Sequence, residues 1–342
     1  MIKVSETLGW KKKIIRNKYT VYFSGHFIND SQDSVLNNLF NNFDVNYFKS
    51  QNFINKVKDL KGNFGIILEF NKAIIGITDK INSRKIYYSE IEQNIFLTNS
   101  PQLLQSNIDI NDINSLNNGA VLEIAMSGYS IDNKTIFKKI KKLRPSEILI
   151  FDKKINKINY YVFKNNSTAN SLNYLSLKNK FNDIILNNTE NIIKLNHSRE
   201  LVLSISAGKD SRLIASAFSR LGYKNLKLLS YGNPKAYESR AAKQIAEKLS
   251  YKFIQIPLTI KSQKNFFLSS IFKDFKNKTN TLSSITFLQD ISSFYLAKKN
   301  RLIDNNSIII NGNGGDFLSG GHLISHNDKQ FVFSQRETLF LG

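Results

Sequence analysis

The sequence predicts two domains, a strand-rich α+β domain followed by an α/β domain built around a parallel sheet. At 342 residues the chain exceeds the usual size of one core, and its 41% hydrophobic and 12% aromatic residues can fill two cores. Short β-branched and aromatic runs dominate the first half, whereas strands and helices alternate in the second. The polar stretch 165–171 separates these patterns and is predicted to be a linker, which places the domains at 1–165 and 172–342.

Paired strands are expected to make up most of the first domain. Residues 20–23 form a β-branched and aromatic run that we expect to end at Ser24-Gly25. Two runs on either side of Asn71 predict a hairpin. The elements expected in this domain are strands at 20–23, 63–70, 72–78, 86–88, 95–98, 121–124 and 147–151, and a short helix at 31–40.

The second domain is expected to begin with an amphipathic helix, because Leu177, Phe181 and Ile184 recur at helical spacing. Beyond it we expect strands at 201–205, 226–231, 253–256 and 307–310, helices at 211–221 and 237–249, and mostly helical segments over 262–300. The helix at 211–221 is predicted to bury a face formed by Leu213, Ile214, Ala217 and Leu221. This alternation predicts a parallel sheet with helices on both faces, whose ligands bind at the carboxyl ends of the strands.

The most informative segment joins the strand at 201–205 to the helix that follows, and reads Ser206-Ala207-Gly208-Lys209-Asp210-Ser211. A helix N-terminus offers unpaired backbone N–H groups to an anion, and a glycine lets the backbone approach it closely. The serine hydroxyls can donate hydrogen bonds, and Asp210 can hold a metal ion that a polyphosphate brings with it. An ordinary strand–turn–helix with a serine cap is the alternative interpretation.

Two further loops follow strands of the predicted parallel sheet, at 230–233 and at 311–316, the latter reading Asn-Gly-Asn-Gly-Gly-Asp. Because parallel strands end at one edge, we expect Asp210 and Asp316 to share one Mg²⁺ that bridges the phosphates of ATP. A helix N-cap is the alternative role for Asp316. His322, His326 and Glu238 are expected to be ordinary surface or helix-start residues.

Bulk composition limits the classes of function. The net charge of +21 favours either an anionic partner or a generally lysine-rich composition, and the scattered lysines favour the second, so nucleic acid is not an expected partner. The absence of cysteine excludes disulfides, thiolate metal sites and a cysteine nucleophile in this chain. With no signal-peptide pattern and no stretch approaching the length of a membrane span, we expect a cytoplasmic protein.

The order Ser-x-Gly-x-Asp-Ser resembles the pyrophosphate loop (PP-loop) of the ATP pyrophosphatases rather than a Walker-type loop. Over nearly its whole length the chain resembles the asparagine synthetase family. The segments that carry this resemblance are 60–70, 76–90 and 95–104 in the first domain, and 203–215, 228–253 and 308–322 in the second. The resemblance implies a four-layer, Ntn-hydrolase-like glutamine amidotransferase fold for the first domain and an adenine nucleotide α hydrolase-like fold for the second.

The resemblance also implies roles for individual residues. Pyrophosphate would be held by Ser206, Gly208, Asp210 and Ser211. Asp210 and Asp316 would be the catalytic ligands of Mg²⁺. Adenosine would contact Ile205, Tyr231, Asn311 and Gly312. The implied reaction is the ATP-dependent adenylation of a carboxylate, with release of pyrophosphate and AMP as an amine forms an amide. ATP and Mg²⁺ are the implied cofactors.

Departures from the family pattern shape the remaining expectations. The family's glutaminase requires a cysteine after the initiator Met1, whereas Ile2 stands here, so the first domain is predicted to be degenerate and catalytically inactive. Ammonia or another amine would then come from solution or from a partner amidotransferase. Asn313 and Phe317 replace two glutamates of the family pattern, which leaves the substrate open between aspartate and a sugar uronic acid of surface-polysaccharide assembly.

The family's helical C-terminal region is missing after Gly342, so we expect a shortened relative or a fragment. A non-catalytic nucleotide-binding remnant and a tRNA-modifying PP-loop enzyme are the alternative functions. A homodimer is a possible assembly.

Overall fold

A computed structural model of the protein describes residues 1–6, 9–28, 30–42, 44–91, 94–105, 112–164 and 173–315. The chain divides into two compact units, Met1–Ser167 with Leu268–Phe287, and Thr168–Phe267 with Leu288–Gly342. Leu268–Phe287 therefore packs with the first unit, although its position in the sequence lies within the region predicted as the second domain. The predicted linker, Asp316, Phe317, His322 and His326 lie outside the described residues.

The first unit is built on antiparallel strands, as its sequence predicts. Its described strands are β1 (Lys11–Ile15), β2 (Tyr19–Phe27), β3 (Gly62–Phe70), β4 (Ala73–Thr78), β5 (Tyr87–Ile91), β6 (Asn94–Thr98), β7 (Lys141–Lys142), β8 (Glu147–Asp152) and β9 (Lys154–Asn159). Its described helices are α1 (Gln32–Leu39), α2 (Gln51–Asp59), α3 (Gln102–Gln105), α4 (Asn118–Ser127) and α9 (Ser270–Thr279), with short 3-10 helices at Val45–Lys49 and Ile113–Ser115. The strands form a six-stranded sheet in the order β1-β2-β3-β4-β8-β9 and a three-stranded sheet in the order β6-β5-β7.

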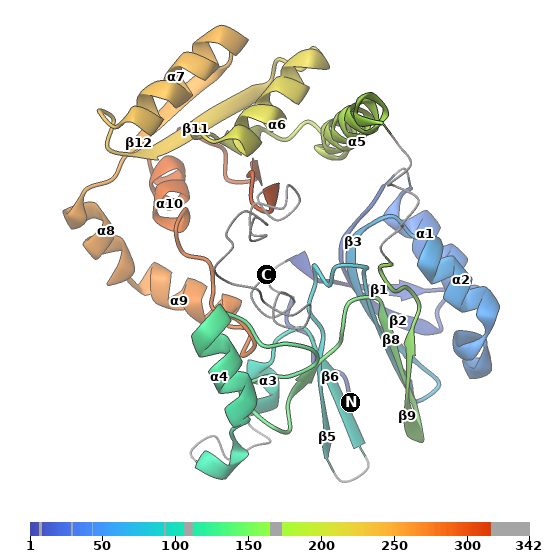
Figure 1. Ribbon diagram of the computed structural model, residues 1–342. Helices are drawn as coiled ribbons and strands as arrows, with labels where there is room; N and C mark the ends of the chain where they lie inside the picture. The colour runs from blue at the N-terminus through green and yellow to red at the C-terminus, as the bar shows by residue number, and fades with distance from the viewer. Residues whose placement is uncertain are drawn as a thin grey trace. The chain divides into compact units, whose positions relative to one another are not determined.

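The first unit is layered, with α1 and α2 lying along one side of the larger sheet (Figure 1). One face of the larger sheet packs on α1 and α2 through an aromatic core. In this core the Tyr19 and Phe70 rings stack with their centroids 4.4 Å apart. The other face packs on the smaller sheet through residues such as Ile67 and Leu97. Tyr87, on the smaller sheet, also joins a cluster with Leu104 of α3. The relation of this layered unit to the Ntn-hydrolase fold stays a prediction.

The predicted hairpin at Asn71 is confirmed, whereas the expected end of the strand that begins near Thr20, which is β2, is wrong. Asn71 and Lys72 both have positive φ, 47° and 66°, and form the two-residue turn between β3 and β4. β2 runs through Gly25 to Phe27. A Cβ on Gly25 would overlap the backbone of Asn63, so glycine here permits the close approach of β2 and β3 and does not end the strand.

The strand predicted at 121–124 is a helix, α4. Asn117 caps this helix by accepting a hydrogen bond from the Ala120 backbone N–H, and Gly128 ends it with a φ of +86°. The run Val121–Ile124, with three apolar residues and Glu123, is too short for its period to separate strand from helix, so the capping residues decide.

The second unit contains the predicted parallel sheet. Its described strands are β10 (Leu201–Ser204), β11 (Leu226–Gly232), β12 (Lys252–Pro257) and β13 (Ile308–Ile310). Its described helices are α5 (Tyr174–Leu195), α6 (Lys209–Arg220), α7 (Tyr237–Leu249), α8 (Ile260–Phe267) and α10 (Ile291–Lys299). The strand order is β12-β11-β10-β13, and every neighbouring pair is parallel.

Helices cover both faces of this sheet, which confirms the prediction (Figure 1). On one face the sheet packs against α6 and α7 and the end of α5. On the other face it packs against α10, whose Ala297 is fully buried. The predicted buried face of α6 is partly wrong, since Leu213 and Leu221 are exposed and α6 buries Ala215 and Phe218 along with Ala217. The small Ala215 lets the helix lie close to the sheet, and the Phe218 ring fills the remaining space.

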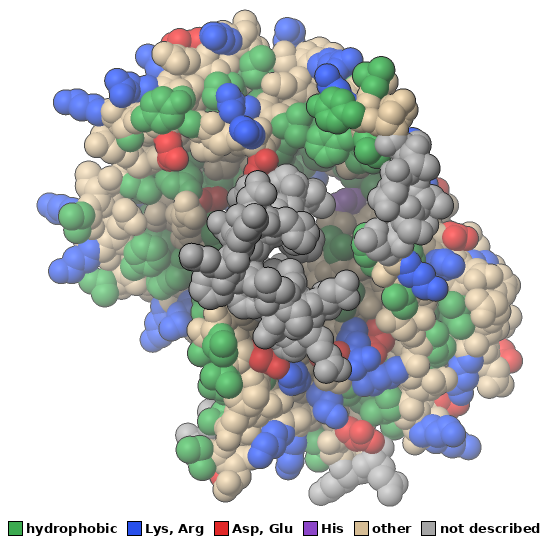
Figure 2. All heavy atoms as spheres, in the orientation of Figure 1, with side chains coloured by type: hydrophobic (Ala, Val, Ile, Leu, Met, Phe, Trp, Pro, Cys, Tyr) green, Lys and Arg blue, Asp and Glu red, His purple; other side chains and the backbone are tan. Residues whose placement is uncertain are grey.

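Charge and hydropathy of the described residues add two findings. No helix in the described ranges is long and apolar enough to cross a membrane. On the face shown in Figure 2, lysine and arginine side chains are spread out, with acidic and apolar side chains between them.

Candidate functional site

The parallel sheet brings most of the predicted site residues to one edge. Because β10, β11 and β13 run in the same direction, the segments that follow them lie side by side. These segments carry Ile205, Ser206, Gly208, Asp210, Ser211, Asn311 and Gly312, and β11 itself carries Tyr231 near its end. The carboxyl ends of parallel strands are where α/β sheets bind ligands.

The first loop is folded on itself by its serines. The Ser206 hydroxyl accepts a hydrogen bond from the Gly208 backbone N–H at 3.1 Å and lies 3.2 Å from the Ser211 hydroxyl, which in turn accepts from the Ser206 N–H at 3.2 Å. Ile205 continues the pairing of β10, since its N–H donates to the Leu229 carbonyl at 2.8 Å. With only 3% of Ile205 exposed, its backbone alone can reach a ligand.

The start of α6 leaves its first-turn amides without a side-chain cap. Gly208 occupies the N-cap position and has no side chain to offer them. Those N–H groups and the positive end of the helix dipole therefore face the loop at the sheet edge, where an anion can accept from them. The predicted anion cradle is consistent with this geometry.

The loop after β13 packs directly against the loop after β10. A Cβ on Gly312 would lie 3.1 Å from the Ser211 nitrogen and 3.2 Å from the Asp210 Cβ. A Cβ on Gly315 would overlap the Asp210 carboxylate, so with the Asp210 side chain in this position there is room for glycine only. Gly314 has a φ of +91°, which also favours glycine. The glycine-rich sequence of the distal loop is thus explained by close contact with Asp210.

Asp210 is the predicted metal ligand that lies within the described part of this edge. Its carboxylate accepts no hydrogen bond and forms no ion pair within the described ranges. No group of three or more potential metal-ligating side chains is present in that part of the chain. Magnesium bound by one or two carboxylates together with substrate phosphates fits such a donor set. Asp316, the other predicted ligand, lies outside the described residues, so the shared ion stays a prediction.

A cavity of about 390 Å³ lies at the ends of β11 and β12, near Tyr231. Its lining residues are Tyr231, Gly232, Leu258, Gln263, Phe267, Leu288 and Gln289. The Tyr231 hydroxyl donates to the Asp290 carboxylate, and burial together with that carboxylate raises the pKa of Tyr231, so the phenol stays neutral. Apolar walls with a few polar groups suit a planar ring. The sequence reasoning missed Leu258, Phe267 and Asp290, because no motif marks these helical and loop positions.

The opposite, amino edge of the same sheet holds a buried carboxylate, Glu200, which the sequence reasoning also missed. It forms an ion pair with Lys227 of β11 and accepts hydrogen bonds from the Ser307 hydroxyl at 2.7 Å and the Asp304 N–H at 3.0 Å. Burial alone would raise the pKa of Glu200, but these partners outweigh burial and hold its pKa below the ordinary value. Glu200 thereby ties together β10, β11 and the segment before β13.

No protein-family model and no curated protein matches this sequence. Among solved structures, the NH3-dependent NAD synthetase from Campylobacter jejuni, in complex with the nitrate ion, is similar with a TM-score of 0.28 and 21% identity over 42% of this chain and 59% of that chain. The glutamine phosphoribosylpyrophosphate amidotransferase from B. subtilis, complexed with ADP and GMP, has a TM-score of 0.28 and 11% identity over 87% of this chain and 62% of that chain. The glutamine-dependent NAD+ synthetase from Acinetobacter baumannii, in complex with ADP, has a TM-score of 0.30 and 12% identity over 86% of this chain and 67% of that chain.

The chain therefore covers less than two thirds of the length of the first two of these proteins, 59% and 62%. What the comparison gives is a distant structural resemblance to NAD synthetases and to an amidotransferase. Likeness this distant says nothing specific about activity, which has to follow from the geometry of the site itself.

Proposed function

We propose that the second unit binds Mg²⁺-ATP at the carboxyl edge of its parallel sheet and uses it to adenylate a carboxylate, in the manner of the asparagine synthetase family. The observation that carries this proposal is the packing of Gly312 and Gly315 against Ser211 and Asp210. That packing makes the two loops parts of one polar site, with a carboxylate, two hydroxyls and a helix N-terminus close together.

The loop after β10 is suited to the β and γ phosphates. The first-turn N–H groups of α6 and the hydroxyls of Ser206 and Ser211 donate hydrogen bonds to phosphate oxygens. Asp210 holds Mg²⁺, and Asp316 is proposed as its second ligand. When bound, the ion neutralises charge on the departing pyrophosphate.

The cavity beside Tyr231 is suited to the adenine ring. The backbones of Ile205 and Gly312 are proposed to contact the nucleoside. A nucleotide placed in this way has its α-phosphate near the strand ends. An oxygen of the acceptor carboxylate attacks the α-phosphorus, the bond to the bridging oxygen breaks, and pyrophosphate leaves. An amine then attacks the acyl carbon, an amide forms, and AMP leaves with the electron pair of the broken C–O bond. The protein contributes mainly positioning and charge neutralisation.

The nitrogen donor is proposed to be ammonia or an amine from solution or from a partner amidotransferase. The chain has no cysteine to act as the glutaminase nucleophile. The acceptor is proposed to be aspartate or a related acid such as a sugar uronic acid, because Asn313 stands where the family pattern has a glutamate.

The test is release of pyrophosphate and AMP from ATP and Mg²⁺ with a panel of carboxylates, each with ammonium or with glutamine as nitrogen donor. We expect release that requires one of the carboxylates and ammonium, and none of it in Asp210→Asn. The matched control is Asp183→Asn, which neutralises an exposed carboxylate on α5 of the same unit. Release of ADP and phosphate instead, or binding of ATP without any pyrophosphate release, would contradict the proposal.

A further inference from the structure

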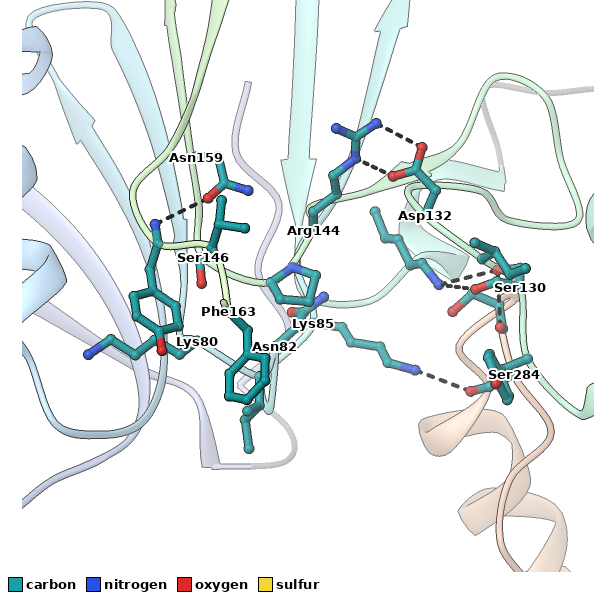
Figure 3. A pocket seen from close by; sticks show the side chains of 18 residues that line it. Lys80, Asn82, Lys85, Ser130, Asp132, Arg144, Ser146, Asn159, Phe163 and Ser284 are labelled. Atoms are coloured by element: carbon teal, nitrogen blue, oxygen red, sulfur yellow. Dashed lines mark hydrogen bonds and ion pairs between the residues drawn. The ribbon is translucent and has the colours of Figure 1, made fainter. Parts of the chain in front are cut away.

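The first unit contains a cavity of about 620 Å³ that plays no part in the proposed nucleotide site (Figure 3). All of its lining residues belong to that unit, and they come from the β4–β5 connection, the segment after α4, the end of β7 with the β7–β8 connection, the end of β9 with the segment after it, and the segment after α9. The volume lies in the range of small-molecule sites.

Two lysines provide positive charge inside this cavity. The Lys142 ammonium donates to the Ser130 carbonyl at 2.8 Å and to the Ser130 hydroxyl at 3.2 Å. The Lys85 ammonium donates to the Ser284 hydroxyl at 3.1 Å, as Figure 3 shows. Within the described ranges neither lysine forms an ion pair with a carboxylate. Both ammonium groups are therefore held by neutral oxygens alone.

The nearby acidic groups already have their own partners. The Asp132 carboxylate forms an ion pair with the Arg144 guanidinium and accepts from two of its nitrogens, with Arg144 Nη2 at 2.7 Å from Asp132 Oδ2 (Figure 3). Glu123 forms an ion pair with Lys134 and also accepts a hydrogen bond from the Ile131 N–H at 2.9 Å. The charges within each pair cancel. Lys85 and Lys142 are therefore the partly buried cations of this cavity that have no carboxylate partner among the described residues, whereas Lys80 is exposed at its rim.

Burial makes this arrangement costly to the folded protein. Burial lowers the pKa of Lys85. Burial and the charge of Lys85 lower the pKa of Lys142 to about 8, against the opposing effect of Asp132 and Glu123. An unpaired buried ammonium destabilises a fold, and an anion placed between two of them removes that cost.

The rim of the cavity is apolar and open to solvent. Its apolar side chains include Ile81, Tyr129, Ile131, Val162 and Phe163, of which Ile81 is 71% and Phe163 83% exposed. Lys80 is also at the rim, and its ammonium nitrogen lies over the Tyr161 ring, 5.2 Å from the ring centroid. Exposed apolar side chains gathered around a concave site are typical of a ligand-binding surface.

We propose that this cavity binds a small organic anion, a carboxylate or phosphate monoester on an aromatic or aliphatic body, with its charged group between Lys85 and Lys142 and its body against the apolar rim. The two ammonium groups supply the donors that such a head group needs. The rim side chains supply the contact that an inorganic ion could not use.

The test is calorimetry on the full chain with phenyl phosphate and benzoate as probes, and with inorganic phosphate, acetate and benzyl alcohol as partial ligands. We expect at least one of the two probes to bind with a Kd below about 1 mM. Inorganic phosphate and acetate lack the aromatic ring of the probes, and benzyl alcohol lacks their charge. Each of these partial ligands should bind at least tenfold more weakly than the probe that binds. Lys85→Met and Lys142→Met should each weaken the probe at least tenfold, whereas the exposed Lys58→Met, with the same charge change, should not.

Thermal unfolding of the lysine variants separates loss of the site from loss of the fold. Replacing a partly buried lysine that has no carboxylate partner by methionine removes a desolvation cost, so both variants should unfold at or above the temperature of the unsubstituted protein. The proposal would be overturned if neither probe showed saturable binding. It would also be overturned if the Lys85 and Lys142 variants bound a probe as tightly as the unsubstituted protein does. The result is independent of the nucleotide site, whose test uses Asp210.

Uptake of protons by the protein when an anion binds is a second measurable consequence of the proposal. The charged groups around Lys142 are Lys85, Lys134, Arg144, Glu123 and Asp132. Because a bound anion favours the charged ammonium, binding near pH 8 should take up protons. The affinity for benzoate should fall as the pH rises above about 8, approaching tenfold per pH unit for one linked proton. An affinity that does not change between pH 7 and pH 9 would contradict the assigned position of the charged group.

Discussion

The two edges of the parallel sheet each hold a carboxylate beside β10, and the two are in opposite states. At the amino edge, Glu200 forms an ion pair with Lys227 and accepts hydrogen bonds from the Ser307 hydroxyl and the Asp304 N–H. At the carboxyl edge, Asp210 has no such partner in the described part of the chain and is backed by the glycines of the distal loop. A satisfied carboxylate contributes to stability, whereas an unsatisfied one is available to a cation.

The largest expected effect is on activity at the carboxyl edge. Asp210→Asn should lower the rate of pyrophosphate release at least about 100-fold, because the charge that holds Mg²⁺ is lost. Its free energy of unfolding should change by no more than about 1 kcal/mol, the value of a carboxylate in the first turn of a helix. Steady-state rates and urea unfolding measure the two quantities. A loss of stability large enough to account for the loss of activity would remove the distinction between the edges.

The glycine contact at the same edge predicts the next effect. In Gly315→Ala the new methyl group would overlap the Asp210 carboxylate, so either the Asp210 side chain has to rotate out of its position or the distal loop has to move. We expect the affinity for Mg²⁺-ATP, measured by calorimetry, to fall at least tenfold. Gly119→Ala in α4 is the control, because its Cβ meets nothing closer than 3.6 Å. This control should be neutral or stabilising by up to about 1 kcal/mol, and an unchanged affinity in Gly315→Ala would show that the loops do not form one site.

Stability is the quantity expected to change at the amino edge. Glu200→Gln leaves the partly buried Lys227 without its counterion and should lower the free energy of unfolding by about 2 kcal/mol. Its affinity for ATP should be unchanged, since Glu200 lies at the far end of β10. Urea unfolding and calorimetry check both expectations, and a loss of ATP affinity in a folded Glu200→Gln protein would contradict the division of roles.

A smaller effect is expected from pH. Because the pKa of Glu200 is held below its ordinary value, the stability that Glu200 contributes is present above the unfolded pKa of about 4.3 and is lost as the pH falls through the lower folded pKa. The stability difference between the unsubstituted protein and Glu200→Gln should therefore shrink below about pH 4. Urea unfolding between neutral and acidic pH measures this difference, and a constant difference would argue against a paired carboxylate.

The parallel sheet and the loop after β10 could be predicted from the sequence because their signals are local. Alternating apolar runs predict β10, β11 and β12. The small and polar residues from Ser206 to Ser211 predict the turn into α6. The glycines of the distal loop are also a local signal, and the structure supplies the reason for two of them, which is contact with Asp210 and Ser211.

What could not be predicted depends on contacts between distant segments. The segment after α9 joins the first unit through hydrogen bonds from the Ser130 N–H to Ser283 and from the Ile136 N–H to Leu282, both at 2.8 Å, and no local pattern marks either contact. Lys85 lies in the β4–β5 connection and Lys142 in β7, and both look like surface lysines in the sequence. Their burial in one cavity is visible only in the folded unit.

Calorimetry of ATP binding with and without Mg²⁺ tests the central claim most directly. The account predicts that Mg²⁺ strengthens ATP binding equally in the unsubstituted protein and in Glu200→Gln, and that Asp210→Asn loses this strengthening while remaining folded. Equal strengthening by Mg²⁺ in all three proteins, or none in any of them, would show that the carboxyl edge of the sheet is not a magnesium–nucleotide site.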